Sequence, residues 1–331
     1  MGPLTVVAPD GVPEISAGDD LGAIVLAAFG PDGLTDGDIL VVTSKVVSKA
    51  EGRVVDGDRE QWIDSESVRL VARRGLTRIV RNRLGLTMAA AGVDASNVTA
   101  GTTVLLPEDP DASARALRAT VAERAGVNVG VLITDTAGRA WREGQTDIAI
   151  GAAGVVVLES FVGRVDAHGN ELAVTAPAVA DEIASAVELA QGKLGSRPCA
   201  VLRGRPDLVL PADDHGTGAS ALIREDGADL FGYGAREAVV RAVGGAEADR
   251  APFGTPVSAE EFVAALRAAG LAAEIDGVQQ VRCAEDRRVA LDILAFAHGW
   301  RVDSTTAPGG PAKPHAKGFA DTDLRLHPVT P

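Results

Sequence analysis

The chain has 331 residues, 46% of them apolar, so it can bury a sizeable core and form more than one domain. Its net charge of −14 argues against nucleic acid or an anionic membrane as a partner. The two cysteines, Cys199 and Cys283, provide no disulfide framework and no metal-ligand pattern. No basic N-terminal segment precedes an apolar core, and no apolar run is long enough to span a bilayer, so we expect a cytoplasmic protein.

Apolar and amphipathic segments alternate irregularly through the first 243 residues, which predicts an α+β (mixed α/β) fold rather than a regular βαβ succession. Asp19 and Asp20 mark the start of the first helix, because carboxylates cap exposed N–H groups there, and Asp111 is expected to act in the same way. The expected strands are Leu4–Ala8, Ile39–Thr43, Thr77–Arg81, Thr102–Leu106, Val129–Ile133, Val155–Leu158 and Ala200–Arg203. The expected helices are Asp20–Phe29, Arg59–Arg73, Asp111–Ala125, Ala178–Ala190 and Ala235–Val243.

The composition changes after residue 243. Residues 244–257 are rich in Gly, Ala and Pro and are interpreted as a linker. Residues 258–303 form a small α/β module of unknown role, in which Ser258 caps a helix and Asp276-Gly277 marks a hairpin. Its expected elements are a helix over 258–270, strands over 272–275 and 278–282, a helix over 284–297 and a strand over 300–303. Residues 304–331 are expected to be a disordered tail.

A polar segment, ITDTAGRAWREGQTDIAIG, extends from Ile133 to Gly151 and directly follows an apolar strand. It places carboxylates, threonine hydroxyls and arginines within about one loop's length. Carboxylates bind hard cations such as Mg²⁺, and arginine forks match phosphate or carboxylate oxygens. The alternative is a polar loop with surface ion pairs.

Further polar blocks are dispersed along residues 4–243. They are PDGVPEISAGDDL, VVTSKVVSKAEGR, NRLGL, LTMAAAGVDASNV, HGNEL, ADEIASAVELAQGK, AVLRG and LIREDGADLF. In this order they resemble the coenzyme F-420:L-glutamate (gamma-glutamyl) ligase family. The segments TSKVVSK and GRAWR are most similar to the ligase domain of the bifunctional actinobacterial enzymes. The residues after the linker are too few for the flavin-binding domain of those enzymes, so its reductase activity is not expected here.

This resemblance implies a family-specific two-part ligase fold for residues 1–243 and a homodimer. It also implies GTP-dependent addition of L-glutamate to coenzyme F-420-0 through an acyl phosphate, which gives a gamma-linked oligoglutamate tail. The partners would be GTP, L-glutamate and F-420-0. One alternative is a nucleotide- and metal-dependent ligase or phosphotransferase with a different carboxylate acceptor, and another is a non-catalytic binding protein that has kept the fold.

The resemblance places a divalent metal on Asp94, Asp135 and Thr136. Oxygen ligands suit Mg²⁺ or Mn²⁺, and two ions per site are expected for phosphoryl transfer. K⁺ assists relatives but has no assignable position here. Taken alone, Asp94 would more often be a helix cap or part of a tight turn.

The family's nucleotide positions match several residues of this chain. The segment formed by Val12, Pro13, Glu14 and Ile15 matches one whose backbone contacts guanine. The other matches are Ser44, Lys49, Asn97, Gly192 and Lys193. Lys45 follows the same strand as Lys49 and is the alternative candidate for the lysine near the phosphates. Archaeal relatives have Gln where Lys193 stands, and because a protonated lysine cannot bind a metal, contact with phosphate is the better interpretation.

Two arginines, Arg139 and Arg142, join Asp94 and Asp135 as the expected catalytic residues. With Gln145 and Asp147, they are expected to shape the side of the site that receives the anionic acceptor and glutamate. His168 and His215 lie in polar loops and are interpreted as exposed histidines without a role in catalysis.

Overall fold

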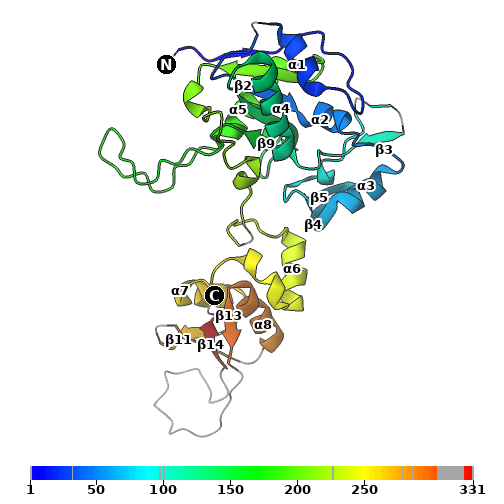
Figure 1. The fold of residues 1–331 in the computed structure, drawn as a ribbon. Helices are drawn as coiled ribbons and strands as arrows, with labels where there is room; N and C mark the ends of the chain where they lie inside the picture. The colour runs from blue at the N-terminus through cyan, green and yellow to red at the C-terminus, as the bar shows by residue number, and fades with distance from the viewer. Residues whose placement is uncertain are drawn as a thin grey trace, which may run out of the picture. The chain divides into compact units, whose positions relative to one another are not determined.

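The computed structural model describes residues 2–31, 33–96, 98–99, 101–225, 227–277, 279–284, 287–303 and 324–329. The chain divides into two compact units, an N-terminal unit of Met1–Ile223 and a C-terminal unit of Arg224–Pro331. Both units combine helices with sheets, which confirms the predicted α+β class (Figure 1). Within the described residues, no helix is long and apolar enough to cross a membrane.

A five-stranded mixed sheet forms the centre of the N-terminal unit, in the order β1-β10-β2-β8-β9. The strands are β1 (Thr5–Val7), β2 (Ile39–Thr43), β8 (Gly130–Gly138), β9 (Gln145–Ala153) and β10 (Cys199–Arg203). Strands β2 and β8 are parallel, and the other neighbours are antiparallel. Because β2 and β8 run in the same direction, the residues that follow them meet at one edge of the sheet.

Helices cover both faces of this sheet (Figure 1). One face packs against α1 (Leu21–Phe29), α2 (Ser44–Ala50) and α4 (Pro110–Ala125), and the other packs against α5 (Val179–Gln191). Alternate residues of β8 point to opposite faces, so Ile133 belongs to the first core and Leu132 to the second. Each such fully buried side chain stabilises the fold by about 1.5–3 kcal/mol.

Two small sheets lie beside the central one. One pairs β3 (Val54–Asp56) with β7 (Thr102–Val104), and the other contains β4 (Ser67–Arg74), β5 (Thr77–Asn82) and β6 (Thr87–Ala89). With α3 (Arg59–Glu66), they enclose a separate apolar cluster around Ile63, Val80 and Leu105.

A buried arginine connects distant parts of the N-terminal unit. The side chain of Arg118, on α4, is only 3% exposed, yet its guanidinium donates to several oxygens. The acceptors are the carbonyls of Val129 (2.9 Å), Leu210 (3.0 Å), Pro211 (2.8 Å) and Asp214 (2.6 Å) and the side-chain oxygen of Asn128 (2.8 Å). These bonds fix the loop of residues 210–214 against α4 and β8.

The C-terminal unit has its own core. Helices α6 (Ala235–Gly244), α7 (Ala259–Ala268) and α8 (Arg288–Ala297) accompany a sheet of order β11-β12-β14-β13. The strands are β11 (Ala273–Ile275), β12 (Val281–Cys283), β13 (Trp300–Val302) and β14 (Leu324–Pro328). Phe262 and Trp300 stack at its centre with ring centroids 4.9 Å apart. The predicted cap is confirmed, because the Ser258 hydroxyl accepts from the Glu261 N–H.

Several predicted elements differ from the structure. The helix expected over 59–73 ends at Glu66 and continues as β4, where alternating Val68 and Leu70 favour a strand. Residues 155–158 form no strand of the sheet. Instead β9 occupies 145–153 and overlaps the polar segment 133–151, in which no strand was expected after Ile133. This strand begins with polar residues and otherwise contains mostly small ones, so it lacks the run of large apolar side chains from which strands were predicted.

The boundary between the units also differs from the predicted one. The division precedes Arg224, so α6 belongs to the C-terminal unit. The predicted linker is not an open spacer, because Phe253 packs edge-on against Tyr233 and Phe296. In the predicted tail, residues 304–323 lie outside the described residues, and Leu324–Pro328 is a strand between β12 and β13. Its alternation of buried Leu324 and Leu326 with Arg325 is typical of a half-buried strand.

Replacing Arg118 with methionine is expected to lower the free energy of unfolding by about 3 kcal/mol or more, because several buried carbonyls would lose their donor. Chemical denaturation monitored by circular dichroism measures the change. Arg124→Met is the matched control on the same helix, where the guanidinium is 44% exposed and paired with Asp20. Equal stability of the two variants would contradict the anchoring role of Arg118.

Candidate functional site

The carboxylate of Asp135 lies where the parallel strands β2 and β8 end. Thr43 pairs with Thr134 in the register of the two strands, so the next residues, Ser44 and Asp135, are neighbours. The Ser44 hydroxyl donates to the Asp135 carboxylate at 2.9 Å. Strand Ile39–Thr43 was predicted with these bounds, and this meeting of the two polar ends follows from the sheet.

A lysine contacts the second predicted metal ligand. Lys45 Nζ lies 2.6 Å from Asp94 Oδ2, and it also donates to the hydroxyl (2.7 Å) and the carbonyl (3.1 Å) of Ser96. Burial would raise the pKa of Asp94, but the hydrogen bonds from Lys45 and Ser96 outweigh it and hold that pKa below its usual value. Asp94 is therefore charged, and an ammonium group already neutralises it.

The negative charge of Asp135 is less well compensated by its neighbours than that of Asp94. The pKa of Asp135 is raised to about 7, mainly by burial and in addition by the negative charges of Asp147 and Asp94, while the hydrogen bond from Ser44 opposes the rise. The ammonium of Lys45 opposes this shift. A carboxylate in such surroundings favours a nearby cation, because a positive ion removes both the desolvation cost and the repulsion.

A second polar cluster occupies the face of β8 that packs against α5. Asp147 is only 4% exposed and accepts from the hydroxyls of Thr136 (2.8 Å) and Thr134 (3.3 Å). Lys193 Nζ lies 3.2 Å from the Thr136 hydroxyl. Asp147 reaches this place because β9 pairs with β8 and sets it opposite Thr136. It was predicted to shape the acceptor side, and its contact with Thr136 also joins it to a predicted metal ligand.

Lys193 follows the end of α5, and Gly192 ends that helix in a left-handed conformation (φ 64°). Burial raises the pKa of Glu188, on the last turn of α5, and the charge of Asp147 adds to the effect while Lys193 opposes it. Negative charge thus accumulates on both faces of the β8 end, and one lysine stands at each face.

The predicted guanine segment lies beside a third lysine. Lys49, on α2, is buried and contacts the Glu14 carboxylate. Val12 and Ile15 pack on the core beneath α1 and α2, so the segment, which is neither helix nor strand, is anchored by its apolar side chains. Asn97 lies outside the described residues.

The contacts of Arg139 and Arg142 that the structure describes do not place either arginine next to Asp135. Arg139 and Arg142 lie in the turn between β8 and β9, beyond Gly138, and both are exposed. Arg139 donates to the Glu143 carbonyl at 2.9 Å, within the turn. Gln145 begins β9 opposite Gly138. The exposed histidines His168 and His215 lie in loops, as predicted, and His215 Nδ1 is 3.3 Å from Arg118.

The oxygen donors suit a divalent cation, but they do not form a complete cage. Among the described residues, no group of three or more His, Cys, Asp or Glu side chains is arranged to hold a metal ion. Mg²⁺ is usually held by one or two carboxylates together with water and substrate phosphates. Asp94 and Asp135 on one face, and Asp147 with Thr136 on the other, meet that requirement.

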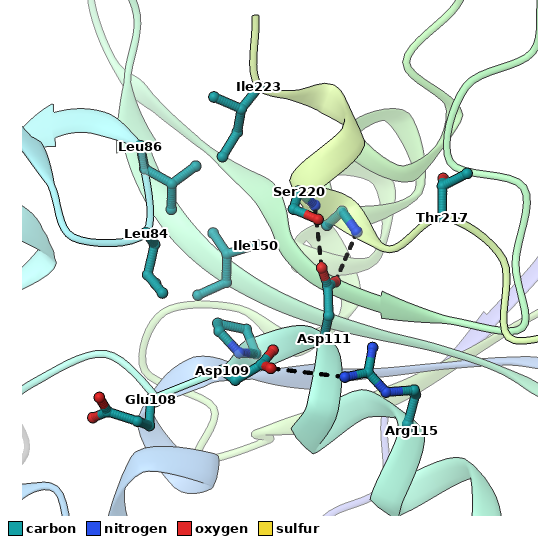
Figure 2. A pocket seen from close by; sticks show the side chains of 12 residues that line it. Leu84, Leu86, Glu108, Asp109, Asp111, Arg115, Ile150, Thr217, Ser220 and Ile223 are labelled. Carbon is teal, nitrogen blue, oxygen red and sulfur yellow. Dashed lines mark hydrogen bonds and ion pairs between the residues drawn. The ribbon is translucent and has the colours of Figure 1, made fainter. Parts of the chain in front are cut away.

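The sequence did not predict the pocket that Figure 2 shows. It has a volume of about 450 Å³ and lies between the β5–β6 loop, the start of α4, β9 and residues 217–223. Asp111, expected to cap α4, does not do so, because Asp109 caps it. The Asp111 carboxylate instead accepts from the N–H groups of Ala152 (2.8 Å), Ala219 (2.7 Å) and Ser220 (3.3 Å). No sequence signal marks these contacts, which join segments far apart in the chain.

Known proteins resemble most of the N-terminal unit. Residues 11–204 match the family described as F420-0:Gamma-glutamyl ligase. A Coenzyme F420:L-glutamate ligase from Archaeoglobus fulgidus is 39% identical over 217 residues, which cover 59% of this chain and 85% of the relative. The protein of the same name from Methanopyrus kandleri is 38% identical over 256 residues, or 70% of this chain and 100% of the relative. The one from Methanothermobacter thermautotrophicus is 33% identical over 252 residues, or 69% and 98%. The match of more than half of the chain, with identities at this level over nearly whole relatives, means that the chain belongs to the F420-0:gamma-glutamyl ligase family.

Proposed function

We propose that the protein is a ligase that uses GTP to join L-glutamate to coenzyme F-420-0. The relatives named Coenzyme F420:L-glutamate ligase support the acceptor and the amino acid. The observation that carries the proposal is the paired set of carboxylates and lysines at the end of β8, because such a set suits a metal–triphosphate complex.

Divalent cations, Mg²⁺ or Mn²⁺, would be held by Asp94 and Asp135 on one face and by Asp147 and Thr136 on the other. When bound, they would neutralise charge on the phosphates and leave the γ-phosphorus open to attack. Ser44 orients Asp135 through its hydroxyl. K⁺ would act as an activator in this scheme, without an assigned residue.

The reaction proceeds in two steps. A terminal carboxylate oxygen of F-420-0 bonds to the γ-phosphorus as the bond to GDP breaks, which gives an acyl phosphate. The amine of L-glutamate then attacks the acyl carbon, phosphate leaves, and the nitrogen loses a proton as the amide forms. Because the reacting groups are anionic, the protein contributes mainly by positioning them and neutralising their charge.

The lysines have separate tasks in this scheme. Lys49 and Lys193 contact phosphate oxygens as point charges, Lys49 beside the guanine segment and Lys193 beside Thr136. Lys45 holds Asp94 in place through its 2.6 Å contact. The two lysines lie against different carboxylates, Lys45 against Asp94 and Lys49 against Glu14, which supports separate roles for them.

We also propose that the chain acts as a homodimer. A hairpin after β9 is joined by backbone hydrogen bonds such as Phe161 N to Thr175 O (2.9 Å) and projects from the N-terminal unit (Figure 1). It exposes Val162, Val165 and Val174 to solvent. A second copy of the chain would cover this apolar surface.

Asp135→Asn and Asp94→Asn are each expected to lower turnover by orders of magnitude and to weaken the binding of Mn²⁺, because a charge that holds the cation is lost. Product mass with F-420-0, L-glutamate, GTP and Mn²⁺ measures turnover, and electron paramagnetic resonance measures bound Mn²⁺. Asp56→Asn, at an exposed strand end, is the control. Turnover close to wild type at saturating Mn²⁺ would remove that aspartate from the site.

GTP is expected to give a higher kcat/KM than ATP. The backbone of residues 12–15, which lies outside helices and strands, offers N–H and C=O groups that can distinguish the edge of guanine from that of adenine. Steady-state release of phosphate with each nucleotide, at fixed F-420-0 and L-glutamate, measures the ratio. Equal values for the two nucleotides would contradict a guanine-specific segment.

Replacing Val162 and Val174 together with aspartate is expected to shift a dimer toward monomer, because the charges would oppose burial of the hairpin. Sedimentation velocity of wild type and variant at the same concentration shows the shift. The control is a double change on the exposed face of α6, Val239→Asp with Val243→Asp. If the wild-type chain sediments as a monomer, the dimer proposal fails.

A further inference from the structure

The pocket has one apolar wall and one polar wall (Figure 2). Leu84 and Leu86, from the β5–β6 loop, lie near Ile150 and Ile223, and Thr217, Ser220 and Arg115 line the other side. Its volume of about 450 Å³ is in the range of sites for small organic ligands. Aliphatic side chains facing hydroxyls and a guanidinium suit a flat heterocycle that has polar groups on its edge.

The carboxylates around this pocket are occupied by internal partners. Asp111 accepts from three backbone N–H groups. Glu108 lies 3.2 Å from Arg53 and 3.5 Å from Arg83. Asp109 caps α4 through the Ala112 N–H (2.9 Å) and lies 3.7 Å from Arg115. Their charge is therefore largely compensated before a ligand enters, so an anionic ligand is not excluded.

The pocket lies on the same face of the sheet as Asp135. Ile148 pairs with Asp135 across the β8–β9 ladder, and Ile148, Ile150 and Ile133 all contribute to the same apolar cluster. Ile150 is two residues from Ile148, which corresponds to about 7 Å along a strand. A ligand seated against Ile150 would thus place an extended tail within reach of Asp135.

We propose that this pocket binds the tricyclic deazaflavin ring of the acceptor, with the carboxylate tail extending along β9 toward Asp135. This inference rests on the proposed function for the identity of the acceptor. The aliphatic wall would cover one face of the ring. Ser220, Thr217 and Arg115 would contact the N–H and C=O groups on its edge.

Guanine is the other flat heterocycle in the reaction, and the structure favours the deazaflavin ring here. Recognition of guanine by side chains typically uses a carboxylate that accepts from its N–H groups, and the Asp111 oxygens already accept from backbone. The predicted guanine segment, residues 12–15, lies instead beside Lys49 on α2.

Filling the pocket tests the proposal. Ser220 and Thr217 are exposed at its edge, so Ser220→Trp and Thr217→Trp add bulk without disturbing a buried side chain. Ser65→Trp, an exposed change on α3 outside the pocket, is the matched control. Equilibrium dialysis of the full chain with F-420-0, followed by absorbance, measures acceptor affinity, and dialysis with GTP and Mn²⁺ measures nucleotide affinity.

Each pocket variant is expected to weaken F-420-0 binding by about tenfold or more, while GTP affinity stays within about twofold of the Ser65→Trp control. Unchanged F-420-0 affinity in both variants would overturn the proposal, and so would a loss of GTP affinity in place of F-420-0 affinity. Failure of the wild-type chain to bind F-420-0 would also overturn it.

Product mass separates the two proposals. If the wild-type chain binds F-420-0 through this pocket but forms no glutamylated product, the proposed function fails and the pocket assignment stands. If it forms the product while both tryptophan variants bind F-420-0 as the control does, the function stands and the pocket assignment fails.

Discussion

The buried guanidinium of Arg118 is the contact on which the architecture of the N-terminal unit depends. It lies on α4 and donates to the carbonyl of Val129, which precedes β8, and to carbonyls of the loop from Leu210 to Asp214. A buried cation needs compensation, and here backbone carbonyls that accept its hydrogen bonds supply much of it, together with the charges of Asp213 and Asp214. The loop continues into residues 217–223, so the same contact sets the wall of the pocket and the position of α4 beneath it.

The chemistry of the site follows from two strand pairings. The parallel pair β2–β8 brings Ser44 to Asp135, and the antiparallel pair β8–β9 brings Asp147 to Thr136. Carboxylates therefore accumulate on both faces of one strand end, and the lysines that accompany them come from α2 and from the end of α5. This edge remains negative in an acidic chain, so local cations and lysines, rather than net charge, would attract the triphosphate of the proposed reaction.

Sequence reasoning succeeded where the signal is local. The strand Ile39–Thr43 and the cap at Ser258 follow from patterns within a few residues. The contact of Lys45 with Asp94 joins residues 49 positions apart, and the three bonds of Asp111 join residues 41, 108 and 109 positions apart, so no local pattern encodes them. Strand β9 was missed because small and polar residues occupy most of it. Family resemblance supplied the site residues, and the pairing of β9 with β8 then showed that Asp147 contacts Thr136.

Each unit contains one cysteine, and both are fully shielded: Cys199 lies on β10 and Cys283 on β12. Burial raises the pKa of Cys199 to about 12, and the thiolate is the reactive form of a thiol. Modification by a thiol reagent therefore requires transient opening of the surrounding sheet. The chain thus contains two natural reporters, and the rate at which each sulfur reacts gives the opening frequency of its own unit without any introduced label.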